Sequence, residues 1–221
     1  MNRADETLRK ELPTFMVPVY EPLPPCETGR SRLLMAKEGL YIETVQPWGT
    51  FRGQLWDSPR PLPYGRIEEK DTFANCLHDL EDPIRNVIEP EAGEYARKGL
   101  EWAGWILWSR EDGYHYLPLD FEATPTKAKF KAPRLPEGTY LAVDIHSHHR
   151  MTPRFSSTDD HDDHARVKIT LCLGDYRPHE KERFTMAGRY AIEGFFFDIG
   201  EECKDTLNTF PLEDFSCNDT D

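Results

Sequence analysis

Short, strongly apolar segments recur along this chain from residue 101 onward and are separated by polar stretches. They cover residues 101–108, 140–146, 167–173 and 189–199. Each is long enough for a strand, and the β-branched and aromatic content favours strands over buried helices. A helical pattern precedes them between Asp71 and Lys98, with a break expected at Pro90 to Gly93. Separated buried strands combined with helices predict an α/β or an α+β fold.

The first 70 residues have a different composition from the rest. They hold 10 basic and 10 acidic side chains, whereas residues 71–221 hold 17 and 30, so the net charge of −13 lies entirely in the second part. Nine of the 18 prolines fall between Pro13 and Pro63. We therefore expect a β-rich N-terminal module at 1–70, a main domain at 71–200, and an acidic C-terminal tail at 201–221.

Charge and hydropathy exclude two classes of partner. An acidic chain lacks the basic face that nucleic-acid binding requires. No apolar run approaches the roughly 20 residues of a membrane-spanning helix. The first residues contain no apolar core, so we expect no signal peptide, and five scattered cysteines predict no disulfide framework. A cytoplasmic location is the simplest expectation.

Two histidines at the end of an apolar strand carry the clearest chemical signal. His146 and His148 are two residues apart, and side chains at i and i+2 of a strand point to the same face. Asp159 follows after a loop long enough to fold back towards them. Two imidazoles and one carboxylate suit zinc and leave the fourth position open, which is typical of catalytic sites. Glu101 begins a strand that we expect to lie beside the histidine strand.

The spacing of these residues resembles the signature of the JAB/JAMM (MPN+) zinc metalloprotease family. In that signature His-Ser-His is followed by seven residues, a serine, two residues and an aspartate. The matching positions here are His146, Ser147, His148, Ser156 and Asp159. So strict a pattern arises rarely by chance.

The resemblance extends beyond the histidine motif. Glu101 stands where the family has its upstream glutamate, and the similarity covers about residues 71–200. The chain is most similar to a branch found in bacterial cassettes beside ThiF-like activating enzymes and ubiquitin-like proteins. It departs from many relatives at His149, where they have proline.

The resemblance implies a JAMM/MPN-type α/β domain, in which a mixed sheet is flanked by helices. It also implies a zinc-dependent isopeptidase or peptidase that cuts after the C-terminal glycine of a ubiquitin-like protein. The residues expected to hold Zn²⁺ are His146, His148 and Asp159. Glu101 would act as general base and then general acid, work that is typically worth about 10²–10⁴-fold in rate. Ser156 would donate to the oxyanion, and loss of such a donor typically costs about 3–4 kcal/mol. Ser147 is expected to orient the loop on the substrate-binding side.

Simpler interpretations exist for parts of the motif. Ser-x-x-Asp before a helix is also a capping box, and both roles are compatible. Ser157 and Asp160 form an alternative pair one residue later. The run from Asp160 to His164 suggests a second metal, but solvated acids at a helix start explain it more simply.

Three lysines alternate with apolar residues just before the histidine strand: Lys127, Lys129 and Lys131. The simpler interpretation is an edge strand protected from aggregation by its charges. The functional hypothesis is that this basic edge binds an extended substrate tail by strand addition.

Three rival functions remain at this stage. The first is a non-catalytic MPN-like scaffold, although no ligand of the signature is missing. The second is a RadC-like protein with DNA-linked duties, which the acidic balance and Ser147 disfavour. The third is hydrolysis of a small molecule at the same type of metal site.

Overall fold

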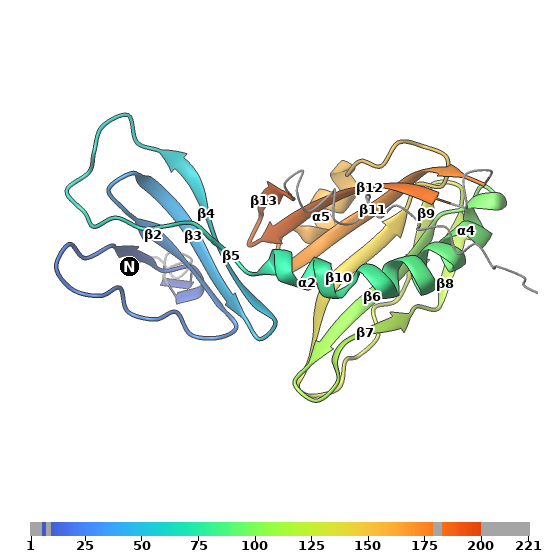
Figure 1. Cartoon of the computed structure of the whole chain (residues 1–221), viewed down its shortest axis with the longest axis horizontal. Coiled ribbons are helices and arrows are strands. Elements are labelled where there is room, and N and C mark those ends of the chain that lie inside the picture. Colours follow the sequence, from blue (N-terminus) through green and yellow to red (C-terminus); the bar gives the residue numbers. More distant parts are fainter. Residues whose placement is uncertain (1–5, 8–9, 179–182, 200–221) are drawn as a thin grey trace, which may run out of the picture.

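The computed structural model describes residues 6–7, 10–178 and 183–199 of the chain. Figure 1 shows two main groups of strands, the first from the N-terminal part and the second from the remainder, with helices between them in sequence. The mixture of sheets and a few helices is consistent with an α/β fold of the JAB type. The expected acidic tail at 201–221 lies outside the described residues. No helix in the described part of the chain is long and apolar enough to cross a membrane.

The N-terminal part forms a five-stranded sheet in the order β1-β2-β3-β4-β5. Its strands are β1 (Thr14–Met16), β2 (Arg30–Met35), β3 (Gly39–Gln46), β4 (Gly49–Asp57) and β5 (Lys70–Asp71). The sequence predicts β2, β3 and β4 but not the two short edge strands, which are held only by their neighbours. Glu43 pairs within this sheet with both Arg32 and Arg52.

Four consecutive helical segments follow, without the break expected at Pro90 to Gly93. They are α2 (Phe73–Asp79), α3 (Glu81–Pro83), the π-helical turn η1 (Ile84–Ile88) and α4 (Glu89–Arg97). Pro90 occupies the first turn of α4, directly after the wide π turn, where its missing N–H is tolerated. Gly93 lies buried in α4 beside the Tyr176 ring, where a Cβ would come within 3.2 Å of the hydroxyl. The predicted break is therefore wrong.

The second sheet has six strands in the order β13-β12-β11-β10-β6-β7. They are β6 (Trp102–Ser109), β7 (Gly113–Pro118), β10 (Thr139–Ser147), β11 (Val167–Arg177), β12 (Arg183–Ile192) and β13 (Phe195–Asp198). Only the β10–β11 pair is parallel, so the sheet is mixed as predicted. A separate hairpin consists of β8 (Phe121–Thr124) and β9 (Lys127–Phe130), and α5 (Ser157–Asp163) precedes β11.

The two faces of the six-stranded sheet have different partners. Helices α2 to α4 lie across one face (Figure 1). Their buried apolar side chains share a core with alternate strand residues such as Ile106, Ile145 and Leu171. Because strand side chains alternate between faces, Asp144 and His146 on β10 point away from this core. The opposite face is thus free to carry polar chemistry.

The two sheets are joined by aromatic packing. The Phe51 ring on β4 lies 5.9 Å from Phe73, 4.9 Å from Tyr190 and 4.8 Å from Phe197, measured between ring centroids. Phe51 and Phe73 belong to the same buried cluster as the core of the second sheet. Buried aromatic side chains contribute large apolar areas, so this contact fixes the N-terminal sheet against the rest of the chain.

Candidate metal centre

Strand register brings the proposed site residues together on the face opposite the helices. His146 on β10 lies between Ala103 on β6 and Cys172 on β11. The expected pairing of the Glu101 segment with the histidine strand is confirmed, because Ser147 pairs with Trp102, the residue after Glu101. Small side chains beside His146 leave space above the sheet. The site therefore lies where the parallel strand pair β10–β11 ends.

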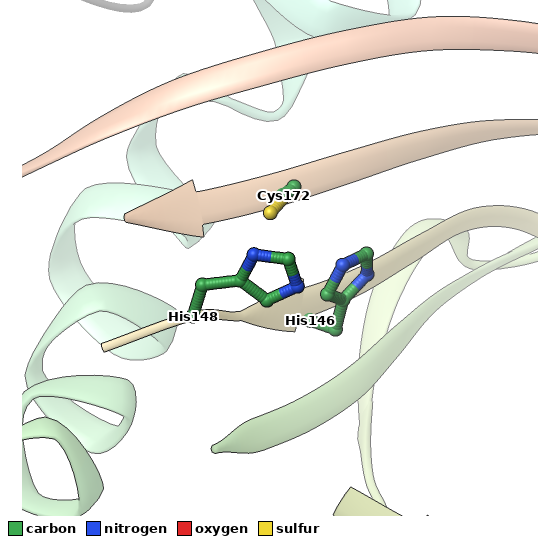
Figure 2. Close-up of side chains that lie close together, drawn as sticks. All are labelled: His146, His148 and Cys172. Carbon is green, nitrogen blue, oxygen red and sulfur yellow. The ribbon is translucent and has the colours of Figure 1, made fainter. Parts of the chain in front are cut away.

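The two histidines and one cysteine form a compact group of metal-binding side chains. The His146 and His148 ring centroids are 5.0 Å apart. One potential ligand atom from each histidine and the sulfur of Cys172 all lie within 4.8 Å of one another. Figure 2 shows the two rings side by side and tilted relative to each other, with the Cys172 sulfur beside the His148 ring. Burial lowers the pKa of His148, with a further contribution from His146, which favours the neutral form that binds metals.

A tightly packed loop leads from His148 to α5. His149 adopts a left-handed conformation (φ 43°), and its Nε2 lies 3.0 Å from the Pro125 carbonyl in the β8–β9 turn. The loop then passes directly over Gly174 of β11, where an added Cβ would lie 2.4 Å from the Met151 carbonyl oxygen. Only glycine permits this approach. The close passage returns the chain towards the histidines, so that α5 begins beside them.

Asp159 and Ser156 lie at the first turn of α5 and form the capping box expected from the sequence. The Ser156 hydroxyl donates to Asp159 Oδ2 at 2.7 Å, and the Ser156 backbone N–H donates to the same oxygen at 2.6 Å. Asp159 Oδ1 remains directed at His146, 3.8 Å from Nε2. Burial alone would raise the pKa of Asp159, but His146 and the bonds from Ser156 bring it below its ordinary value. Asp159 is therefore an ionised carboxylate with one oxygen directed at His146.

Glu101 is held just before β6 by the β8–β9 hairpin. Its backbone N–H donates to the Thr124 carbonyl at 2.9 Å, and the backbone of Ala128 hydrogen-bonds its carboxylate. The residue is only 8% exposed. Burial, followed by the nearby Asp159 charge, raises the pKa of Glu101 to about 7. Such a carboxyl group can both accept and release a proton near neutral pH.

The raised pKa of Glu101 predicts a pH-dependent stability in the metal-free protein. The unfolded chain binds this proton more weakly than the folded chain does. The contribution of the protonated Glu101 to stability is therefore fully present below about pH 4.5 and is lost as pH rises through about 7. Partial solvent screening reduces the effect to about 2 kcal/mol. Denaturant titrations with a chelator present measure the free energy of unfolding of the wild type and of Glu101→Gln. The difference, wild type minus variant, should fall by about 2 kcal/mol between about pH 5 and pH 8. A difference that does not change with pH would contradict the burial of this carboxyl group.

A cavity of about 190 Å³ joins these groups. The predicted site residues on its wall are Glu101, Lys127, His146, His148, Ser156 and Asp159. Lys129 lines an adjoining cavity with Phe130, and Lys131 follows the end of β9 and is exposed. The structure thus brings together the predicted ligands and Glu101, with Lys127 alone of the three lysines beside them.

The expectation for Ser147 is corrected by the structure. Its side chain is completely buried, and its hydroxyl accepts a hydrogen bond from the Trp102 backbone N–H at 3.0 Å. It points to the face opposite His146, because neighbouring strand residues alternate. Ser147 therefore links β10 to β6 instead of contacting a substrate, and it fixes Glu101 relative to the histidines.

The side chains at this site fit a zinc ion. His146 Nε2 is buried and has no hydrogen-bond partner within the described part of the chain. Ligand atoms bound tetrahedrally at about 2.1 Å lie about 3.4 Å apart, close to the 3.8 Å between His146 Nε2 and Asp159 Oδ1. The available donors, imidazole nitrogen, carboxylate oxygen and sulfur, are those that zinc prefers.

The sequence patterns do not predict two features of the site. Cys172 appears in the sequence only as one apolar member of a buried strand, and its register against His146 depends on parallel pairing. Asp163 belongs to the acidic run that was expected to face water, yet it is 2% exposed. The alternative ligand Asp160 pairs instead with Arg189, at 2.5 Å. Asp159 is thus the acid that faces His146.

Two parts of the chain match known protein families. Residues 92–187 match the family of prokaryotic homologs of the JAB domain. The match supports the JAB/MPN family for this part of the chain. Residues 2–74 match a domain of unknown function, DUF2016. No curated protein matches the chain. All the side chains that face the candidate centre, including Cys172, lie within the JAB match.

Proposed function

We propose that this protein is a zinc-dependent hydrolase that cleaves the amide or isopeptide bond after the C-terminal glycine of a ubiquitin-like protein. The observation that carries the proposal is one cavity with two adjacent imidazoles, an ionised carboxylate and a separate protonatable carboxyl group. His146, His148 and Asp159 would hold the ion. Zinc supplies Lewis acidity that activates water and polarises a carbonyl group.

Glu101 has the properties required for proton transfer in such a reaction. It lies on the cavity wall, and its pKa of about 7 matches a group that removes a proton from attacking water and returns it to the leaving amine. Ala128 and Thr124 hold it through the β8–β9 hairpin. Ser156 would turn its hydroxyl from Asp159 towards the developing oxyanion, since it lies on the same wall.

The β8–β9 hairpin is the proposed docking element for the substrate tail. Lys127 lines the cavity, and alternate residues of β9 are exposed. An extended glycine-rich tail could add to such a strand through backbone hydrogen bonds. This placement would bring the bond after the last glycine to Glu101, because Ala128 of β9 already contacts that carboxylate.

Charge reversal of this edge tests the docking proposal. Replacement of Lys127, Lys129 and Lys131 by glutamate should raise KM about tenfold or more, because exposed charges act mainly on association. The wild-type KM should also rise with salt, whereas the variant should lose this dependence. Steady-state kinetics with unchanged KM would exclude the basic edge as a docking site.

The partners proposed are those that a resemblance to the PRTRC system protein A branch would imply. Two segments of the N-terminal part support this placement, Pro13-Thr-Phe-x-Val-Pro and Leu62-Pro-Tyr-Gly. A ubiquitin-like protein and its conjugates would be the substrate, and a ThiF-like activating enzyme of the same cassette would be a functional partner.

One experiment tests the proposed function. Bound zinc is measured first, and cleavage is then tested on a fusion placed after the Gly-Gly end of the ubiquitin-like protein, with Glu101→Ala as control. We expect zinc together with cleavage that depends on Glu101. A folded protein without bound metal would favour a non-catalytic scaffold.

A further inference from the structure

Helix α5 carries Asp159 but has no apolar face to hold it on the sheet. Among its residues from Ser157 to Asp163, only Asp163 is buried. A helix this short is not stable by itself in water, so tertiary contacts must fix it. Most protein helices use an apolar stripe for this purpose. Here a different anchor is required.

The anchor is a set of ion pairs that begins at Asp163. Its Oδ1 lies 2.7 Å from Lys168 Nζ, and its Oδ2 lies 2.7 Å from Arg189 Nη2. Thr170 also donates to Oδ2 at 3.0 Å. The same Arg189 binds Asp160 through its other terminal nitrogen. Two acids one helical turn apart are thus bound to β11 and β12.

The same network reaches the strand that carries the histidines. Lys168 Nζ lies 2.5 Å from Asp144 Oδ2, and Asp144 Oδ1 accepts a hydrogen bond from Trp105 Nε1 at 3.2 Å. Asp144 is two residues before His146 on the same face of β10. The network therefore connects the helix that carries Asp159 to the strand that carries His146 and ends just before His148.

Arg189 is fixed by its surroundings as well as by its charge partners. Its guanidinium carbon lies 4.1 Å from the ring centroids of both Phe155 and Phe196. Phe155 directly precedes the helix cap Ser156. Such cation–π contacts add to the ion pairs and hold the start of α5 at a defined position.

These ion pairs cost desolvation free energy that a helix held only by apolar packing would not require. Buried ion pairs often stabilise a fold no more than apolar side chains of similar size. An acid in the last turn of a helix also opposes the helix dipole. Burial alone would lower the pKa of Lys168, but Asp144 and Asp163 raise it above its ordinary value, so this lysine remains charged. Ion pairs with fixed geometry can define a position more narrowly than apolar contacts.

We infer that Asp163 is a positioning residue for the metal centre: through Lys168 and Arg189 it fixes α5 on the sheet so that Asp159 faces His146. The expected effect on metal binding rests on the proposed function, whereas the anchoring of α5 does not depend on it. Asp163 lines the same cavity as Asp159, but both of its carboxylate oxygens are already bound by Lys168, Arg189 and Thr170. It would act only by positioning Asp159.

The test compares Asp163→Asn with Asp162→Asn, which removes the same charge from the exposed neighbour on the same helix. Zinc dissociation constants are measured by competition with a chelator. Asp163→Asn should weaken zinc binding about 10–100-fold, the range for residues that orient ligands. Asp162 lines the same cavity, so Asp162→Asn controls for the loss of one negative charge near the metal, and the loss of zinc affinity in Asp163→Asn should be clearly larger than in Asp162→Asn. In an Asp159→Ala background, Asp163→Asn should cause no further loss, because the residue acts through Asp159.

Unchanged zinc affinity in Asp163→Asn, or an equal loss in the Asp159→Ala background, would overturn the inference. Hydrogen exchange of the metal-free full chain gives a readout independent of zinc: α5 amides should exchange faster in Asp163→Asn than in Asp162→Asn. Unchanged protection would also overturn it. A wild type that binds no zinc but shows this change would overturn the proposed function and leave the anchoring intact. If Asp163→Asn does not fold, Arg189→Lys, which keeps the charge but loses the fork, must give the same loss.

Discussion

Glu101→Gln is expected to lower kcat about 10²–10⁴-fold while zinc remains bound. Glutamine has nearly the same size as glutamate and can still accept the hydrogen bond from the Ala128 backbone, so the hairpin contact should survive. It cannot accept a proton, however, and the proposed reaction needs one at each of its two steps. The measurement is single-turnover cleavage of the Gly-Gly fusion together with the zinc content of the same sample.

The matched control for this prediction is Glu122→Gln on β8. Glu122 is exposed and carries the same charge on the hairpin that holds Glu101. Its replacement should leave both kcat and bound zinc at wild-type values. If Glu101→Gln hydrolysed the fusion as fast as Glu122→Gln does, proton transfer by Glu101 would be excluded.

His146→Ala should remove zinc and with it all hydrolysis. A residue that only orients a ligand is worth about 10–100-fold in metal affinity, so loss of a ligand should cost more than about 100-fold. The metal-free fold should tolerate the change, because His146 Nε2 forms no hydrogen bond to any described residue. Chelator competition measures the affinity, and thermal unfolding without metal measures the fold.

His161→Ala provides the comparison for this loss. His161 is an exposed histidine on α5, two residues from Asp159, and it lies outside the cavity wall. Its removal should leave the zinc affinity unchanged. A His146→Ala protein with wild-type zinc affinity would place the metal elsewhere.

Local sequence patterns predict those parts of the fold that depend on near neighbours. Alternation and apolar content identify β6, β10 and β11. The His-x-His spacing identifies two imidazoles that lie close together, although β10 ends at Ser147 and His148 follows it. The Ser-x-x-Asp pattern gives the capping box at α5. The expected break at Pro90 fails because a π turn precedes the proline, and single-sequence patterns carry no signal for such a turn.

Long-range register accounts for what the sequence patterns miss. Cys172 lies beside the histidines because β11 runs parallel to β10 with Cys172 opposite His146. Asp163 was expected to be solvated because its neighbours are acidic, but Lys168 and Arg189 reach it from two strands. Ser147 shows the reverse error, since its position between two ligands suggested a surface role that strand alternation forbids. Each case depends on partners that are distant in sequence.

Restoration of cleavage by added zinc directly tests whether the protein is a zinc-dependent hydrolase. The protein is stripped of metal with a chelator, zinc is added back in steps, and cleavage of the Gly-Gly fusion is measured at each step. We expect no cleavage without zinc and a rise that saturates near one zinc per chain. Cleavage that persists in the stripped protein, or a zinc-loaded protein that leaves the fusion intact, would contradict it.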